Sequence, residues 1–251
     1  MIRTLLPAYA AALESTRELP GPALFEAERR QVAGVLPARR AEYATVRRVA
    51  RACLAELGVR PAALVRGTDG APRWPAGTVG SLTHCRGYRA AAVARSRDAD
   101  GVGIDAEPCA PLPARVLAGV TSAAERAHLA ELGAVRRDVP WCRVLFSAKE
   151  AYYKVWYPAM GSWLGFDDAE VVLEPGRGRG TFTVRPVSDG ARRAHRADAA
   201  FDPVATGFPA LHGRWTTGAG LVLTAITAPA GSLPRRAQAG RTATGTLRCA
   251  Q

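Results

Sequence analysis

Two acidic side chains at alternate positions are the first candidates for chemistry. The segment Gly101-Val-Gly-Ile-Asp-Ala-Glu-Pro108 contains Asp105 and Glu107, and residues two apart in a strand face the same side. Two carboxylates held together repel each other unless a cation or a proton lies between them. Mg²⁺ prefers such oxygen ligands and often shares its shell with substrate phosphates. The pair therefore indicates a magnesium and phosphate site, with a strand end whose acids merely face water as the alternative.

The second candidate is the segment that contains both lysines of the chain. Among 34 basic residues only Lys149 and Lys154 are lysine, and both lie in Phe146-Ser-Ala-Lys-Glu-Ala-Tyr-Tyr-Lys154. Lysine and arginine differ in shape, hydration and ability to release a proton, so this clustering indicates chemistry. On a helix, Glu150 and Lys154 share one face, whereas Lys149 lies about 100° round from Glu150. Such a helix would complete the metal and phosphate site; an ordinary surface ion pair is the alternative.

A histidine and a group of arginines are further candidates for binding an anion. Thr83 and His84 lie in Gly80-Ser-Leu-Thr-His-Cys-Arg-Gly87, where both could donate hydrogen bonds to a phosphate; a structural turn histidine is the alternative. Arginines also follow one stripe of a predicted helix, because steps of seven and four residues nearly complete whole turns. These are Arg40, Arg47 and Arg51. The stripe indicates either an anion site or a solvated flank.

The composition bounds the class of protein. The chain has 251 residues, of which 48% are hydrophobic and 22% charged, enough for one large domain or two small ones with a hydrophobic core. No run of about 18 apolar residues is present, so neither a membrane-spanning helix nor a membrane partner is expected. Five scattered cysteines without a C-x-x-C pair favour a reducing cytoplasm over a disulfide framework or a zinc site.

The formal net charge of +12 indicates a polyanionic partner, such as nucleic acid, an acidic protein or a phosphorylated cofactor. An arginine-rich nucleic-acid-binding protein is the main alternative to an enzyme. That alternative leaves the two lysines and the paired carboxylates unexplained. The sequence contains no G-x-x-x-x-G-K-[ST], G-x-S-x-G or H-E-x-x-H pattern, so P-loop, α/β-hydrolase and metalloprotease chemistry are not indicated.

Alternation and helical periodicity predict the elements that position these residues. In the first half we predict a strand over 2–13, helices over 26–32 and 37–57, a hairpin over 79–83 and 88–94, and a strand over 102–107. In the second half we predict helices over 122–132 and 139–156, and antiparallel strands over 169–174, 181–187, 213–217 and 221–228. The first of these two helices begins at a capping box, Ser122-Ala-Ala-Glu125.

Three closely spaced prolines provide the candidate boundary between two halves. Pro108, Pro111 and Pro113 form a stiff connector, so we place an N-terminal subdomain at 1–108 and a C-terminal subdomain at 109–228. The remaining residues, 229–251, contain no acidic side chain and little hydrophobic surface. We predict a flexible tail there.

Taken together, these segments resemble the 4′-phosphopantetheinyl transferases of the larger, monomeric type that activates surfactin synthetase and enterobactin synthetase, and they look most like the actinobacterial members. The resemblance covers about residues 39–168 in the family's order and spacing. The matching stretches are Arg39-Arg40-x-Glu42-Tyr43, Trp74-Pro75-x-Gly77, Gly80-Ser-Leu-Thr-His84-Cys with Gly87-Tyr88, Gly103-Ile-Asp105-Ala-Glu107-Pro108, Phe146-Ser-Ala-Lys-Glu-Ala-Tyr-Tyr-Lys154 and Trp163-Leu-Gly-Phe-Asp-Asp168. The chain departs from the family at Arg66, often a lysine, at Val46, often a glycine, and at Ala106, often an isoleucine. None of these departures removes a reacting group.

The resemblance implies an α+β fold, a pseudo-dimer of two similar subdomains with antiparallel sheets, packed helices and coenzyme A (CoA) in the cleft between them. It implies Mg²⁺-dependent transfer of phosphopantetheine from CoA to a serine of an apo acyl carrier protein or peptidyl carrier protein, with release of adenosine 3′,5′-bisphosphate. Such carriers belong to polyketide, nonribosomal peptide and fatty acid biosynthesis. A cytoplasmic monomer is expected.

The resemblance also implies roles for individual residues. Asp105, Glu107 and Glu150 match the metal ligands, and Asp105 also matches the CoA site. Lys149 and Lys154 match lysines at the CoA phosphates and the reacting centre, which makes Glu150 and Lys154 the expected catalytic pair. The other CoA-binding positions are matched by Thr83 and His84 at a phosphate, and by Arg39, Arg47 and Arg66 around the nucleotide and its 3′-phosphate.

Overall fold

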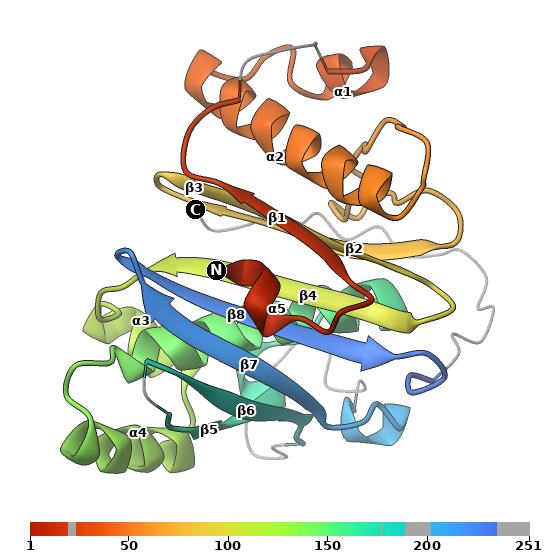
Figure 1. Ribbon diagram of the computed structural model, residues 1–251. Helices are drawn as coiled ribbons and strands as arrows, with labels where there is room; N and C mark the ends of the chain where they lie inside the picture. Colours follow the sequence, from red (N-terminus) through yellow and green to blue (C-terminus); the bar gives the residue numbers. More distant parts are fainter. Residues whose placement is uncertain (20–23, 177, 189–201, 235–251) are drawn as a thin grey trace.

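The computed structural model describes residues 1–19, 24–176, 178–188 and 202–234. Two antiparallel sheets form the framework, and each has helices packed against it (Figure 1). The predicted α+β class, with antiparallel sheets and packed helices, is therefore confirmed. Within the described ranges every helix is too short or too polar to span a bilayer.

The first sheet has three strands in the order β1-β3-β2. They are β1 (Ala11–Ser15), β2 (Thr78–Cys85) and β3 (Tyr88–Arg95), and β2 and β3 form the predicted hairpin. The hairpin turns at Gly87, whose φ of 77° is a conformation that glycine adopts without strain. This turn places His84 at the exit of β2, next to the open end of the sheet.

Helix α2 (Pro37–Glu56), predicted over 37–57, covers one face of this sheet. The short helix α1 (Glu26–Gln31) lies on the side of α2 that faces away from the sheet (Figure 1). Proline at the first helical position suits the start of α2, because no intrahelical bond needs its missing N–H. The apolar stripe of α2 is buried against β3 through Val49, Ala50, Cys53 and Leu54. The opposite stripe of α2 therefore faces α1 and the loop that follows.

The first residues of the chain differ from the predicted strand over 2–13. A 3₁₀ turn, η1 (Ile2–Leu5), precedes β1, and the strand itself starts only at Ala11. Pro7 has no N–H for a strand ladder, so a continuous strand through it is disfavoured. Ile2 and Leu5, three residues apart, are both buried, a spacing that a helical turn accommodates and a strand does not.

The second sheet has five strands in the order β4-β8-β7-β6-β5. They are β4 (Ala99–Pro108), β5 (Ala169–Glu174), β6 (Arg179–Pro186), β7 (Leu211–Gly218) and β8 (Leu221–Pro229). All five coincide with predicted strands to within a few residues. The helices of this half are α3 (Ala114–Val120), which was not predicted, α4 (Ala123–Val135) and α5 (Trp141–Met160), with short turns η2 (Phe166–Asp168) and η3 (Val204–Thr206).

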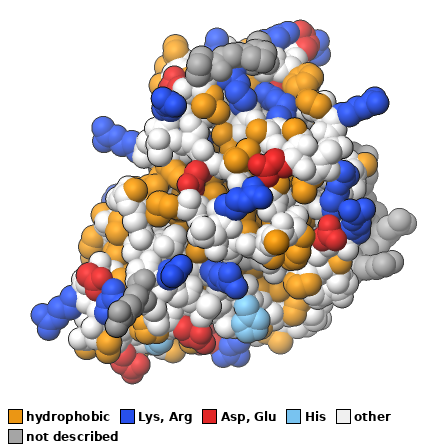
Figure 2. All heavy atoms as spheres, viewed as in Figure 1, with side chains coloured by type: hydrophobic (Ala, Val, Ile, Leu, Met, Phe, Trp, Pro, Cys, Tyr) orange, Lys and Arg blue, Asp and Glu red, His pale blue; other side chains and the backbone are white. Residues whose placement is uncertain are grey.

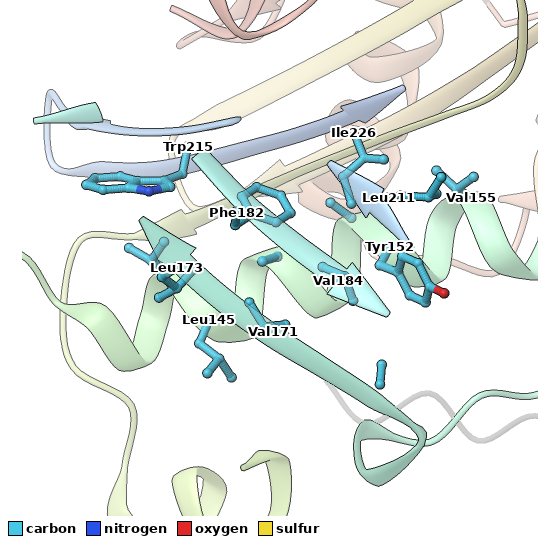
Figure 3. Packing of buried hydrophobic residues seen from close by; sticks show 14 of the residues in the cluster. Leu145, Tyr152, Val155, Val171, Leu173, Phe182, Val184, Leu211, Trp215 and Ile226 are labelled. Carbon is cyan, nitrogen blue, oxygen red and sulfur yellow. The ribbon is translucent and has the colours of Figure 1, made fainter. Parts of the chain in front are cut away.

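Helix α5 packs across the second sheet and carries the lysine motif. Its buried side meets aromatic and aliphatic side chains of the sheet, which include Trp215, Phe182 and Leu173 opposite Tyr152 and Val155 (Figure 3). The helix ends at Gly161, which adopts a left-handed φ of 66°. The helix extends to Met160, beyond the predicted end at residue 156, and Pro158 lies inside its last turn. The predicted capping box of α4 is confirmed, since Ser122 and Glu125 exchange backbone-to-side-chain hydrogen bonds of 2.8 and 3.1 Å.

Strand β4 lies at the seam between the two halves. We expected it to end the N-terminal subdomain at residue 108, but its ladder partner is β8, so it belongs to the second sheet. Its backbone also reaches the first sheet, because Ile104 N donates to Ser81 Oγ at 3.1 Å and Ala106 N donates to Thr83 Oγ1 at 3.1 Å. Residues on β4 can therefore contact both halves.

A glycine permits α5 to lie directly on β4. A Cβ added at Gly103 would lie 1.9 Å from the carbonyl oxygen of Ala151, a distance that no real contact allows. This close approach brings the side chains of α5 within hydrogen-bonding distance of Asp105 and Glu107. The packing of α5 on β4 thus brings the lysine motif next to the strand that contains Asp105 and Glu107.

The predicted tail over 229–251 is only partly within the described residues. Pro229 still belongs to β8, and Leu233 N donates to Asp100 Oδ2 at 3.0 Å. Residues 229–234 are therefore bound to the start of β4. The rest of the predicted tail, 235–251, lies outside the described residues.

Candidate functional site

Asp105 lies at the centre of the candidate site and is held by three donors. Lys154 Nζ lies 2.8 Å and Thr83 Oγ1 lies 3.3 Å from its Oδ1, and Ser147 Oγ lies 2.9 Å from its Oδ2. Only 5% of Asp105 is exposed. Because the donors come from β2 and α5, the carboxylate joins both halves of the molecule.

Glu107 is the second carboxylate of β4, and an arginine of α5 binds it. Arg143 Nη1 donates to Glu107 Oε2 at 2.8 Å, and its other nitrogens donate to the carbonyl oxygens of Ala110 and Pro111. Burial raises the pKa of Glu107, the negative charge of Asp105 raises it further, and Arg143 opposes both effects. The charge of Asp105 thus acts on Glu107, two residues further along the same strand.

Glu150 is the third carboxylate, and it has no hydrogen-bond donor among the described residues. Burial raises its pKa to about 7, the charges of Asp105 and Glu107 add to the rise, and Lys154 opposes it. A carboxylate near neutral pKa can accept a proton at physiological pH. In the absence of a bound cation, Glu150 is therefore the candidate general base among the three acids.

The four polar residues of α5 that face β4 lie on a single stripe of the helix. Their spacing of four, three and four residues keeps them on one face. They are Arg143, Ser147, Glu150 and Lys154. Glu150 and Lys154 were predicted from the sequence, whereas Arg143 and Ser147 were not, although the same helical spacing would have identified all four.

A further residue of this network was not accessible to sequence analysis. Thr224 of β8 is fully buried; its Oγ1 donates to the Ser147 carbonyl at 2.9 Å and lies 2.8 Å from Ser147 Oγ. It orients the serine that binds Asp105. Nothing in the spacing along the chain connects residues 147 and 224, so only the sheet order brings them together.

The donor set of these acids is compatible with a divalent cation. The charge of Asp105 raises the pKa of both Glu107 and Glu150, and a bound cation would remove that repulsion. The described residues include no group of three His, Cys, Asp or Glu side chains already arranged to hold a metal ion. Instead, Lys154 and Arg143 provide the positive charges beside Asp105 and Glu107.

A pocket lined by arginines lies on the N-terminal side of this cluster. Its lining residues come from α2, the loop after α2, and the end of β2, namely Arg39, Glu42, Tyr43, Val46, Arg47, Arg66 and His84. The structure thus brings together four of the residues predicted to bind CoA. Three guanidinium groups and one imidazole share the pocket with a single carboxylate, which makes it an anion site by charge.

Arg47 is buried in this pocket and stacks on an aromatic ring. Its guanidinium carbon lies 3.7 Å from the centre of the Tyr43 ring. Burial lowers the pKa of Arg47 to about 10, and the neighbouring charge of Arg66 lowers it further, so the group remains a cation at neutral pH. The arginine stripe of α2 therefore divides, because Arg51 forms an ion pair with the buried Glu28 at 2.8 Å, while Arg40 is exposed.

His84 contacts Arg39 at the rim of the pocket, through its Nε2 and the arginine Nη1. His84 is exposed at the pocket rim, but the protein atoms beside its ring disfavour the charged form and, together with the charge of Arg39, lower the pKa of His84 to about 4. The imidazole is therefore neutral at pH 7 and can donate one hydrogen bond. Glu42 accepts from Arg39 at 3.1 Å and from Arg89 at 3.2 Å, which fixes the first arginine of the pocket.

The structure does not bring Lys149 to this site. Its Nζ donates to Glu125 Oε2 at 2.9 Å and to the carbonyl oxygens of Val120 and Phe166 at 2.9 and 2.8 Å. Its side chain is 3% exposed. One residue along a helix turns a side chain by about 100°, so Lys149 points toward α4 while Glu150 points toward β4. We expected Lys149 at the CoA phosphates, and the structure places it on the other side of α5, against Glu125.

Thr83 also differs from its predicted position at a phosphate. It is 3% exposed, and its hydroxyl accepts from Ala106 N and donates to Asp105 Oδ1. Alternate residues of a strand face opposite sides, which turns Thr83 toward β4 and leaves His84 exposed at the pocket. Thr83 therefore joins the pocket strand to the carboxylate cluster instead of lining the pocket.

Comparison with known proteins gives a consistent family. The family model described as the 4′-phosphopantetheinyl transferase N-terminal domain matches residues 27–94, and the model of the 4′-phosphopantetheinyl transferase superfamily matches residues 101–200. The 4′-phosphopantetheinyl transferase Svp of Streptomyces mobaraensis is 47% identical over 100% of this chain and 99% of its own length. The transferases PptT of Mycobacterium tuberculosis and Npt of Nocardia iowensis are each 40% identical over 90% of this chain, and over 97% and 99% of their own lengths.

The chain belongs to the 4′-phosphopantetheinyl transferase superfamily and is an enzyme of that class, similar to actinobacterial members. The resemblance that the motifs suggested over residues 39–168 therefore extends over nearly the whole chain. The alternative of an arginine-rich nucleic-acid-binding protein is not the class that the comparisons indicate.

Proposed function

We propose that this enzyme transfers 4′-phosphopantetheine from CoA to a serine of an apo acyl carrier protein or peptidyl carrier protein, in a Mg²⁺-dependent reaction. The observation that supports the proposal is that two sets of complementary groups meet at the end of β2, where His84 lines the pocket and the adjacent Thr83 binds Asp105. An anion pocket of three arginines and a histidine lies beside three carboxylates and a lysine on β4 and α5. CoA combines a phosphorylated nucleotide with a pyrophosphate and matches both parts.

The arginine pocket would bind the nucleotide end of CoA. Arg39, Arg47 and Arg66 supply guanidinium groups for the 3′-phosphate, and each charge-assisted hydrogen bond is worth about 1.5–3 kcal/mol. The neutral His84 would donate to a phosphate oxygen at the rim. His84 contacts Arg39, and the neighbouring Thr83 binds Asp105. CoA bound in the pocket would therefore extend past His84 toward Asp105.

Asp105, Glu107 and Glu150 would hold the magnesium ion. When bound, Mg²⁺ supplies Lewis-acid stabilisation of the charge that develops on the pyrophosphate. The chain's own residues supply alignment and proton transfer. Ser147 and Thr83 orient Asp105, and Arg143 orients Glu107, while the three carboxylates would have to move closer together to share one ion.

Glu150 would accept the proton of the carrier serine as the serine oxygen forms its bond to phosphorus. The bond between that phosphorus and the bridging oxygen breaks, and adenosine 3′,5′-bisphosphate leaves with the negative charge. Lys154 would stabilise or protonate this leaving phosphate, since its ammonium group has three N–H donors and uses two of them within the described residues, on Ile104 O and Asp105 Oδ1. Positioning and charge neutralisation are the main requirements of phosphoryl transfer.

The acceptors would be carrier proteins of polyketide, peptide or fatty acid synthesis, and the enzyme would act as a cytoplasmic monomer. Carrier proteins of this kind are generally acidic, so the net charge of +12 would accelerate their encounter with the enzyme. Basic side chains are spread over both halves of the visible face (Figure 2). The attraction would therefore include long-range steering.

The test is to incubate the purified protein with a fluorescent CoA, MgCl₂ and a panel of apo carrier proteins, and to follow label on the carriers. We expect labelled carriers and free adenosine 3′,5′-bisphosphate in equal amounts, with no reaction in EDTA. A carrier whose acceptor serine is replaced by alanine is the matched control. Failure to label any carrier, or equal labelling in EDTA, would contradict the proposal.

A further inference from the structure

Helix α1 ends at a glutamine whose side chain contacts the arginine pocket from outside. Gln31 Oε1 accepts from the backbone N–H of Arg66 at 2.8 Å and from the hydroxyl of Tyr43 at 3.1 Å. Its Nε2 donates to the carbonyl oxygen of Arg66 at 2.8 Å. One carboxamide therefore binds both backbone groups of one pocket residue and the ring hydroxyl of another.

The segment around Arg66 is held by side-chain contacts as well as by its own backbone. It lies in the loop between α2 and β2, where Gly67 N donates to Ala71 O and Arg73 N donates to Val65 O, both at 2.8 Å. Two residues before Arg66, Leu64 N donates to Glu28 Oε1 at 2.8 Å, and Leu64 O accepts from Arg47 Nε at 3.1 Å. Side chains of α1 and α2 thus anchor this loop to the two helices.

The two residues that Gln31 binds determine the positions of two guanidinium groups. The ring of Tyr43 lies under Arg47, at 3.7 Å, and its centre is 5.7 Å from the guanidinium carbon of Arg66. Like charges this close repel each other, and they separate unless the surrounding structure holds them. Gln31 fixes the backbone of Arg66 and the orientation of Tyr43, so it opposes that separation before an anion binds.

We propose that Gln31 is a positioning residue that sets how tightly the arginine pocket binds the nucleotide end of CoA, and through it the preference for CoA over 3′-dephospho-CoA. The inference rests on the proposed function, which assigns this pocket to the 3′-phosphate. Gln31 touches no substrate in this assignment. It acts by holding the pocket in the arrangement that a phosphate dianion requires, so that less ordering remains at binding.

The test compares two phosphopantetheine donors, CoA and 3′-dephospho-CoA, in the variants Gln31→Ala and Thr68→Ala. In Gln31→Ala the value of kcat/KM for CoA falls about five- to tenfold, the magnitude of one or two lost hydrogen bonds, mainly through KM. The value for 3′-dephospho-CoA changes less than about twofold, because that donor lacks the phosphate concerned. Thr68→Ala, an exposed neutral change in the same loop, leaves both values unchanged. An equal loss with both donors, or no loss with either, would overturn the proposal.

A binding measurement separates this inference from the proposed function. Calorimetry with adenosine 3′,5′-bisphosphate and with adenosine 5′-phosphate needs no carrier and no turnover. We expect Gln31→Ala to weaken the first ligand about five- to tenfold and the second by less than about twofold. Should the wild-type protein label no carrier, this selectivity would still test the pocket.

A conservative variant keeps the test valid if α1 is destabilised. Gln31→Met keeps the length and helix propensity of the side chain but loses all three of its hydrogen bonds. Its loss of selectivity for the 3′-phosphate should therefore match that of Gln31→Ala, at an unchanged unfolding temperature. A Gln31→Met protein that keeps the wild-type selectivity would show that the carboxamide does not act through these hydrogen bonds.

Discussion

Two faces of α5 each carry a lysine paired with a carboxylate, and the two pairs differ in how completely they are satisfied. Lys149 is 3% exposed and uses all three N–H groups on Glu125 and two carbonyl oxygens. Lys154 is 27% exposed and has two acceptors among the described residues. The first pair is closed to any ligand, whereas the second keeps a donor for one.

The carboxylates differ in the same way. Glu125 accepts from Ser122 N, Val171 N and Lys149, so its charge is compensated within the fold. Glu150 has neighbours of its own sign, and its pKa is raised to about 7. Asp105, the partner of Lys154, is itself held by three donors, so the face of α5 suited to chemistry is distinguished by the remaining N–H of Lys154 and by Glu150, and not by residue type.

The largest expected effect is on Glu150. Glu150→Gln should lower kcat by about 10²–10⁴-fold, because the amide cannot accept the serine proton. Calorimetry should show CoA binding within a few-fold of the wild type. The matched change on the other face, Glu125→Gln, should lower the unfolding temperature instead. Full activity of Glu150→Gln would remove Glu150 as the base.

The two lysines should separate activity from stability. Lys154→Met should lower kcat by about 10²–10³-fold, the cost of losing one donor to a developing charge, with little change in unfolding temperature. Lys149→Met leaves Glu125 as a buried unpaired charge, which costs about 3–5 kcal/mol of unfolding free energy. Denaturant titration and initial rates on the same preparations measure both. Similar behaviour of the two variants would refute the contrast between the faces.

The metal assignment gives a third expectation. Asp105→Asn should lower the affinity for Mg²⁺, measured by the magnesium concentration that gives half-maximal rate and by calorimetry in the presence of CoA, by about 10–100-fold, as for loss of a ligand or its support. Ser147→Ala should have a smaller effect in the same direction, since it removes one donor to Asp105. An unchanged magnesium dependence in Asp105→Asn would exclude this carboxylate as a ligand.

A smaller effect is expected in the pocket. Arg47→Ala should raise KM for CoA about tenfold or more, the loss of one charge-assisted hydrogen bond, with kcat changed far less. Arg51→Ala is a contrasting variant from the same stripe, expected to act on stability because its partner is the buried Glu28. A loss of kcat alone in Arg47→Ala would contradict the binding role.

The smallest effect concerns pH and stability. Folding raises the pKa of Glu150 from 4.5 to about 7, so the folded protein binds more protons than the unfolded chain between these values, and this contribution to stability falls as pH rises through that window. In metal-free protein, the unfolding temperature of Glu150→Gln should fall less between pH 5 and pH 8 than that of the wild type. Equal falls would show that Glu150 does not titrate as proposed.

Residue spacing alone determined much of the fold and of the chemistry. The strand with Asp105 and Glu107, the helix with Glu150 and Lys154, the capping box and the hairpin that contains His84 were all predicted and are present, because each depends on periodicity and on caps within about 20 residues. The spacing 143, 147, 150 and 154 also contained the whole polar face of α5. Spacing did not reveal which side of the helix faces the strand, so Lys149 and Glu150 could not be separated.

Tertiary structure decided what depends on contacts between distant segments. Pairing of β4 with β8 placed a strand from the first half in the second sheet and brought Thr224 to Ser147. Packing of α1 beside α2 brought Gln31 to Arg66. Such contacts join residues 35 to 130 positions apart, and their choice reflects the burial of whole apolar faces, which no local pattern of side chains encodes. The sequence therefore determined which groups can do the chemistry, and the packing determined which of them remain free to do it.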